Sequence, residues 1–97
     1  MILTKICDVI TEEINNLDFN KLLNNNSLKL DSFCYLQIHR TYSDNSIKIY
    51  SLHLLFNKKT YVIQNNITED DLLGKDKFNY HLIKNNISET IIKIIMN

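Results

Sequence analysis

Residues 28–64 read LKLDSFCYLQIHRTYSDNSIKIYSLHLLFNKKTYVIQ, and the alternation in this stretch decides the fold. Successive side chains of a strand point to opposite faces of a sheet, so apolar residues at every second position mark one buried face. Here the apolar set falls on even positions: Leu28, Leu30, Cys34, Leu36, Ile38, Tyr50, Leu52, Leu54 and Phe56. The stretch therefore predicts antiparallel strands that share one apolar face.

Two turns divide this stretch into three strands. Residues 43–45 have the composition of a three-residue hairpin loop, because Asn45 tolerates the left-handed conformation that the last loop position requires. A two-residue loop would set polar residues against apolar ones on both faces. The three-residue loop instead predicts pairs that are apolar throughout: Ile38 with Tyr50, Leu36 with Leu52, and Cys34 with Leu54. A second turn at residues 57–60, with a loop of either two or four residues, keeps Tyr61 and Ile63 on the same face, which completes a three-stranded antiparallel meander.

Helical segments flank the strands and supply the cover that the apolar face needs. Residues 3–17 carry apolar side chains at three- and four-residue spacing, which predicts an N-terminal helix. A continuation of this helix through residues 19–23 after a kink is an open alternative. Thr68 and Asp71 have capping-box spacing and Gly74 follows as a C-cap, so we expect a short helix between them.

The last quarter of the chain is less clearly patterned. Residues 75–83 fit a short helix, an edge strand or a loop, and a final helix is predicted to begin at Asn86 or Ser88. A chain of 97 residues makes a single globular domain, residues 1–97. Its predicted class is α+β: an N-terminal helix, a three-stranded antiparallel β-meander, then two short C-terminal helices packed on the sheet.

Composition and charge exclude several classes of protein. Eleven basic and eleven acidic residues cancel, without the excess typical of a non-specific nucleic-acid binder or an acidic DNA mimic. Frequent Asn, Ile and Lys with one Gly and no Pro indicate an AT-rich genome: a low-GC bacterium, its phage or mobile element, or a virus. We find no signal peptide or apolar segment of membrane length, and expect a cytoplasmic protein with no membrane contact. Cys7 and Cys34 are then reduced thiols, a disulfide between them being the alternative.

Histidines and cysteines are the usual carriers of metal and nucleophilic chemistry, and their predicted placement argues against both. In the predicted register His53 lies across from Tyr35, about 13 Å along the strands from His39. That separation is too large for one metal ion whose bonds to nitrogen are about 2 Å. Cys34 points to the core, away from both histidines, and one glycine rules out glycine-rich phosphate loops. We expect no catalytic centre, no metal and no cofactor.

The second face of the predicted sheet is unusual because it is apolar and aromatic, whereas a solvated face normally carries charge. One alternative is that a helix covers this face, which would give a three-layer domain. Another is that the predicted register is wrong, in which case these side chains do not share one face. Otherwise a contiguous apolar patch marks an interface with a partner protein or with a second copy of the chain. The residues that we predict to bind the partner are Phe33, Tyr35, His39, Ile49, His53 and Leu55.

These observations favour a non-enzymatic protein-binding module that occupies the surface of a host or cognate protein. The layout looks like that of some anti-CRISPR inhibitors from phages and mobile elements, a likeness at the level of fold only. The alternative is an RNA- or single-stranded nucleic-acid-binding domain, in which Phe33, Tyr35 and His39 stack on bases. Its phosphate contacts would be basic residues near the sheet: Arg40, Lys48, Lys58 and Lys59. A small enzyme with an unrecognised cysteine or histidine site is a third hypothesis.

The order of helix, three strands and helix also resembles a double-stranded-RNA-binding domain. That family places a basic cluster at the start of its last helix. Here the corresponding residues are Asn85-Asn86-Ile87-Ser88-Glu89, so we do not assign the chain to it.

Overall fold

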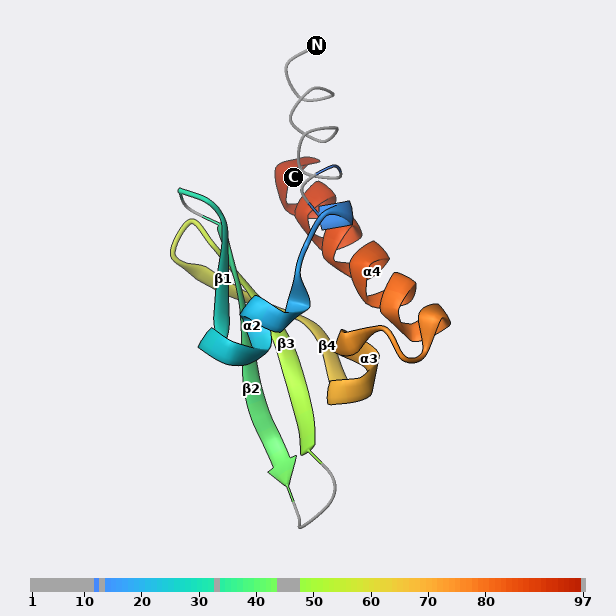
Figure 1. Ribbon diagram of the computed structural model, residues 1–97. Coiled ribbons are helices and arrows are strands. Elements are labelled where there is room, and N and C mark those ends of the chain that lie inside the picture. The colour runs from blue at the N-terminus through green and yellow to red at the C-terminus, as the bar shows by residue number, and fades with distance from the viewer. Residues whose placement is uncertain (1–11, 13, 33, 44–47, 97) are drawn as a thin grey trace.

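The computed structural model describes residues 12, 14–32, 34–43 and 48–96, and its class is α+β, as the sequence predicts (Figure 1). Most of the predicted helix over residues 3–17 lies outside the described residues. At its end the Asn16 amide donates to the Glu12 carbonyl over 3.2 Å, which closes a helical turn. The elements that follow are α2 (Phe19–Asn25), β1 (Ser27–Asp31), β2 (Cys34–Ser43), β3 (Lys48–Phe56), β4 (Lys59–Thr68), α3 (Glu69–Leu73) and α4 (Lys77–Met96).

Helix α2 is a separate short helix with its own caps. The Asp18 side chain accepts a hydrogen bond from the Asn20 amide at 3.0 Å, which satisfies one of the free donors at the N-terminus. At the other end Asn26 adopts the left-handed conformation, with φ of 62°, and its amide donates to the Leu22 carbonyl at 2.8 Å. Asn26 therefore ends the helix.

The sheet has four antiparallel strands in the order β1-β2-β3-β4, so the predicted three-stranded meander is wrong by one strand. The stretch expected to form one long strand reverses direction between Asp31 and Cys34, and Leu28 pairs with Leu36. Directly paired residues point to the same face. Leu28 and Leu36 therefore share a face whether the chain runs straight or folds back, and alternation alone does not distinguish the two.

The predicted register between the second and third of these strands is also wrong, by two residues. Leu36 pairs with Leu54 and Ile38 with Leu52, because pairing continues to Ser43 and Lys48 past a bulge between Arg40 and Tyr42. Ser43 therefore belongs to the strand and not to a three-residue loop; the rest of that loop lies outside the described residues. A two-residue shift keeps every side chain on its predicted face.

The β3–β4 hairpin turns through Asn57 and Lys58, which both have positive φ, and Phe56 pairs with Lys59. This is the two-residue alternative of the predicted turn. Further along, the pairing shifts by one residue at two places, and Asn66 lies in the left-handed region with φ of 60°. Such bulges bend an edge strand and interrupt its row of free backbone groups.

The predicted capping box is confirmed and begins α3. The Thr68 hydroxyl accepts from the Asp71 amide at 3.2 Å, while the Asp71 carboxylate accepts from the Thr68 amide at 3.1 Å. Gly74 ends the helix with φ of 80°. A side chain there would meet the Tyr80 ring in a backbone conformation that L-residues seldom adopt.

Helix α4 is longer than predicted, because it begins at Lys77 instead of Asn86 or Ser88. The ambiguous residues 75–83 thus lie mainly within it. Asparagine favours caps and turns over helix interiors, but packing of a buried face overrides this weak preference. The buried residues of the face are Ile83, Ile87 and Ile91. Asn86 is accommodated because its side-chain amide donates to Gln64 on β4 at 2.8 Å.

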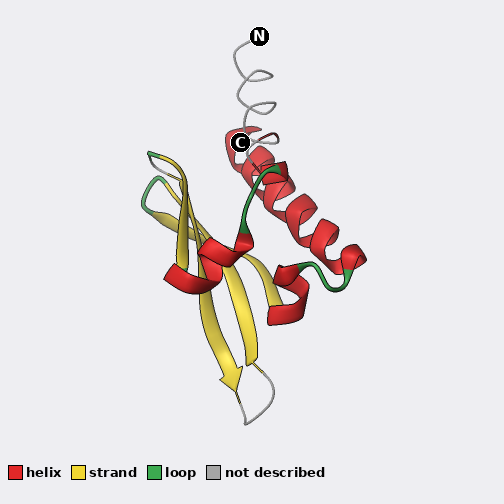
Figure 2. Ribbon diagram, in the orientation of Figure 1, coloured by secondary structure: helices red, strands yellow, loops and turns green. Residues whose placement is uncertain are grey.

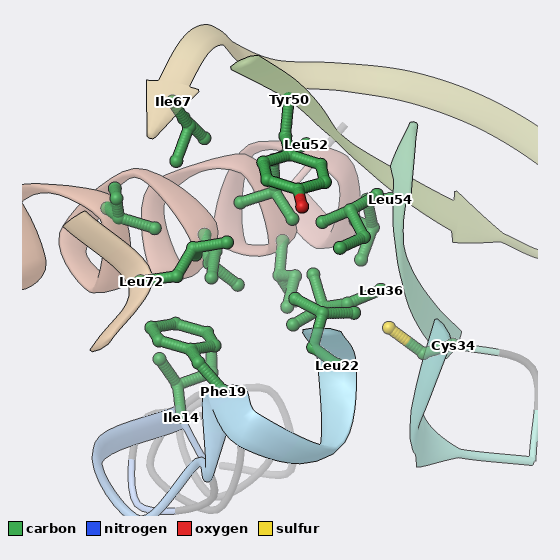
Figure 3. Close-up of a cluster of buried hydrophobic side chains, with 14 residues drawn as sticks. Ile14, Phe19, Leu22, Cys34, Leu36, Tyr50, Leu52, Leu54, Ile67 and Leu72 are labelled. Atoms are coloured by element: carbon green, nitrogen blue, oxygen red, sulfur yellow. The ribbon is translucent and has the colours of Figure 1, made fainter. Parts of the chain in front are cut away.

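One core lies between the sheet and the helices (Figure 3). We call the sheet surface that faces it the core face; its buried members are Cys34, Leu36, Ile38, Tyr50, Leu52, Leu54 and Ile67. Helices α2, α3 and α4 all contribute their buried residues to this same cluster: Phe19, Leu22, Leu72, Ile83, Ile87 and Ile91. Burying each large side chain is worth about 1.5–3 kcal/mol. The described part of the chain is therefore a two-layer domain, and the three-layer alternative is not what it forms (Figure 2).

Residues that precede α2 are fastened to α4 as well. Ile14 is fully buried in the core, and the Lys84 ammonium donates to the Asn15 carbonyl at 2.9 Å. The same ammonium lies 4.5 Å from the centre of the Tyr80 ring, within range of a cation–π interaction.

Candidate functional site

The candidate site is the sheet surface opposite the core, which we call the open face. It is built in rows across the four strands, since paired residues point the same way. The first row is Lys29, Tyr35, Leu55 and Thr60, and the second is Gln37, His53 and Val62. A third row is His39, Ser51 and Asn65, and Ile49 lies beyond it on β3.

Five of the six predicted partner-binding residues lie on this face. His39 is exposed, and Tyr35, Ile49, His53 and Leu55 are half-buried. None of the four belongs to the core cluster or packs against it. Phe33, the sixth, lies outside the described residues. The structure thus groups these side chains on one surface, while their role in binding stays a prediction.

The described side chains of the open face include no carboxylate. Its ionisable groups are Lys29 at one margin, Tyr35, and the two histidines. Val62, at the β4 margin, is 59% exposed, which is high for a valine on a sheet. The described part of the face therefore mixes aromatic, aliphatic and neutral polar side chains, and its lysine, Lys29, lies at the margin.

The largest correction concerns the two histidines, which were expected to be about 13 Å apart. The two-residue shift in register places His39 opposite Ser51, so that His53 is its diagonal neighbour. The ring centroids are 4.7 Å apart and the planes are tilted by 38°. The two imidazoles therefore form a contacting pair on the open face.

Ser51 holds one of these rings in place. Its hydroxyl oxygen is 2.6 Å from His53 Nε2 and 2.9 Å from Asn65 Oδ1. A serine has one proton to donate. If that proton goes to Asn65, then His53 Nε2–H donates to Ser51 and Nδ1 is left with a free lone pair. Ser51 is only 3% exposed, whereas His53 is half-buried and Asn65 is exposed.

The surroundings of His53 favour its neutral form. Loss of solvation lowers the pKa of His53 from its ordinary value of 6.5, and the nearby His39 lowers it further. The neutral imidazole has one lone pair available for a hydrogen bond or a ligand. The arrangement suits hydrogen bonding and ligation better than nucleophilic attack, because the Ser51 oxygen is buried beneath its partners.

Cys34 is separated from this cluster, as the sequence predicts. Its side chain is buried on the core face, on the other side of the sheet from both histidines. A strand backbone therefore lies between the thiol and either possible base. A cysteine–histidine pair of the kind that activates a nucleophile is not formed by these residues.

A groove of about 720 Å³ borders the open face where β1 begins. Its lining includes His39 and Gln37, together with Arg40 and residues at the end of α2. Ile38 is tied here to the loop after α2, since its amide donates to the Asn26 carbonyl at 3.0 Å. Beyond this point β2 has no pairing with β1, because the last pair between them joins Ser27 and Gln37.

The alternation of the strands predicts no role for Ser51, Val62 or Asn65 on this face. The S-x-H spacing of Ser51 and His53 was a usable signal, because residues two apart in a strand share a face. Asn65 gave no such signal. Strand β4 has a bulge opposite the β3 segment between Tyr50 and Leu52. The bulge places the Asn65 side chain on the open face, where it contacts Ser51.

A comparison with protein-family models, curated proteins and solved structures found no match to this chain. Among the described residues, no helix combines the length and apolar character needed to cross a lipid bilayer.

Proposed function

We propose that this chain is a non-enzymatic protein-binding module that uses the open face to occupy the surface of a partner protein. One observation carries the proposal: every described helix packs on the core face, so aromatic and aliphatic side chains of the open face are left without helical cover. Contiguous apolar patches of this kind mark interaction sites on soluble proteins.

The composition of the open face supports this function. Protein interfaces are poor in charge at their centre, rich in aromatic residues, and polar at the rim. Tyr35 and Leu55 are neighbours in the pairing of β2 with β3, with His53 next to them. Lys29 and Thr60 stand at the two margins of the same row. We therefore expect the partner to present an apolar, uncharged surface.

A small inhibitor encoded by a phage or mobile element, of the anti-CRISPR kind, is a protein of this class. The composition typical of an AT-rich genome and the size of the domain support it. A second copy of the chain is the other partner to test, because an apolar face can pair with itself around a two-fold axis.

The test compares two substitutions of leucine by aspartate. Leu55→Asp puts a charge into the open face, and Leu82→Asp puts the same charge on α4, where Leu82 is 39% exposed away from this face. Each variant and the wild type are immobilised and exposed to extract of the source organism, and bound proteins are identified by mass spectrometry. Sedimentation of the purified chains reports self-association.

We expect Leu55→Asp to abolish the specific partner or the dimer and Leu82→Asp to retain it. The melting temperatures of the two variants should be similar. Equal capture by both variants would reject the open face as the binding surface. A collapse of the fold in Leu55→Asp alone would show instead that this face is buried within the chain.

The nucleic-acid alternative has less support, because the basic residues near the sheet do not line one path. Lys58 lies in the β3–β4 turn and Lys48 begins β3 at its opposite end. Binding of a fluorescent single-stranded RNA, measured at several salt concentrations, tests this alternative. Affinity that falls steeply with added salt, with a slope reduced by Lys58→Gln, would favour RNA over protein. A flat profile would exclude it.

A further inference from the structure

We propose that His39 and His53 form a surface site for a divalent transition-metal ion of the Zn²⁺, Ni²⁺ and Cu²⁺ class, with Ser51 and Asn65 as the groups that orient it. This inference goes beyond the protein-binding function, although both proposals use His39 and His53 of the open face. It rests on the spacing of the two rings and on the hydrogen bonds behind one of them.

The spacing fits shared coordination. Bonds from such an ion to imidazole nitrogen are about 2.0–2.1 Å, so two nitrogens on one tetrahedral ion lie about 3.3 Å apart. The ring centroids are 4.7 Å apart with a tilt of 38°, which is close enough for one nitrogen of each ring to reach this separation once the side chains rotate. His39 is exposed and free to make that adjustment. Both residues lie on paired strands, so the backbone holds their relative position.

The hydrogen bonds behind His53 are those of a ligand. A histidine that binds a metal through one ring nitrogen normally donates the other N–H to a fixed acceptor, which sets its tautomer and orientation. The Ser51 hydroxyl oxygen lies 2.6 Å from Nε2, and the hydroxyl donates a hydrogen bond to Asn65 Oδ1 at 2.9 Å. This leaves Nδ1 of His53 as the coordinating atom. The bulge in β4 places Asn65 on the open face, where its side-chain oxygen accepts this hydrogen bond from Ser51.

His53 would bind the ion as the neutral imidazole, because only that form has a lone pair to give. The other ionisable groups on the open face are His39, Tyr35 and Lys29, and no described carboxylate there competes for the ion. The described residues contain no cluster of three His, Cys, Asp or Glu side chains, so water completes the coordination.

The experiment titrates the full chain with Ni²⁺ at pH 7.5 and measures binding by calorimetry and by the ¹⁵N shifts of the imidazoles. His39→Gln and His53→Gln should each weaken binding at least tenfold. Ser51→Ala should weaken it less, because it removes the orienting group and not a ligand. His81→Gln is the matched control: His81 is an exposed histidine on α4, and its loss should change the affinity less than twofold.

Imidazole shifts confined to His39 and His53 and a tenfold loss in either variant would support the site. Equal affinity in wild type and His39→Gln would overturn it, as would a loss in His81→Gln equal to that in His53→Gln. A thiolate-to-nickel absorption band would place the ion on a cysteine and also overturn it. Circular dichroism of each variant, and a rise in its melting temperature with Ni²⁺, keep the test valid where a variant is less stable.

Discussion

The two faces of this sheet are made by the same strands and yet differ in almost every physical respect. On the core face, Leu36, Leu52 and Leu54 are fully buried beneath the helices. On the open face, Tyr35 and Leu55 remain partly accessible, although they alternate with those leucines along the same strands. One side therefore supplies the stability of the domain, and the other is free to be used for binding.

The core face and the open face also differ in the polar groups that they carry. The core face has no pair of imidazoles and is dominated by aliphatic carbon, whereas the open face carries His39, His53 and the buried hydroxyl of Ser51. Buried polar groups cost free energy unless they are hydrogen-bonded, and Ser51 is bonded on both sides.

The largest expected difference in stability between the two faces concerns two neighbouring leucines. Leu54 is fully buried on the core face, and Leu55 is half-buried on the open face. Leu54→Ala should lower the free energy of unfolding by about 2–5 kcal/mol, because it removes packed methyl groups and leaves a cavity. Leu55→Ala should lower it by about 1 kcal/mol or less. Urea unfolding followed by circular dichroism measures both, and similar losses would mean that both faces are core.

A second test removes the one buried polar side chain of the open face. Ser51→Ala takes a hydrogen-bond partner from both His53 and Asn65. These two groups retain some access to water, so the expected loss in free energy of unfolding is about 0.5–1.5 kcal/mol, smaller than for Leu54→Ala. The double variant Ser51→Ala with His53→Gln provides the control, since the two losses should not add if one network is involved. Full additivity would show that Ser51 and His53 act separately.

Much of the fold follows from the sequence because local rules and burial agree. The alternation of residues 34–56 assigned the right side chains to the core face, and the Thr68 capping box and the Gly74 cap lie where they were expected. The hairpin between β3 and β4 likewise has one of the two lengths predicted. These features depend on side chains only a few residues apart.

The two errors in the strand pairing have one common cause, which is that alternation does not distinguish registers that differ by an even number of residues. A reversal between Asp31 and Cys34 and a two-residue slip between β2 and β3 both leave every apolar residue on its face. The candidate site depends on the actual neighbours across the strands, and so it was misjudged although its face was correct. The predicted register separates His39 from His53 because it is wrong by two residues, an error that alternation does not detect.

The start of α4 was missed for another reason. Asparagine at positions 85 and 86 indicates a cap, but Asn86 reaches Gln64 on β4 instead, and the helix continues through it. That contact joins residues 22 positions apart and has no local signature. Tertiary packing along Ile83 and Ile87 outweighs the local preference.

The smallest expected effect is a pH dependence of the stability, which we expect to arise from His53 on the open face. The pKa of His53 is lowered in the folded chain by desolvation and by His39, so the unfolded chain binds more protons in this range. Stability should therefore be constant above pH 7.5 and fall as the pH decreases through 6.5, the ordinary value, toward the lower folded value. Urea midpoints between pH 5.5 and 7.5 measure the slope, in a window above the titration of most carboxylates. His53→Gln should flatten this dependence, whereas His81→Gln on exposed α4 should leave it unchanged. A slope that survives in His53→Gln would assign the proton uptake to other groups and remove the evidence that the two imidazoles are coupled.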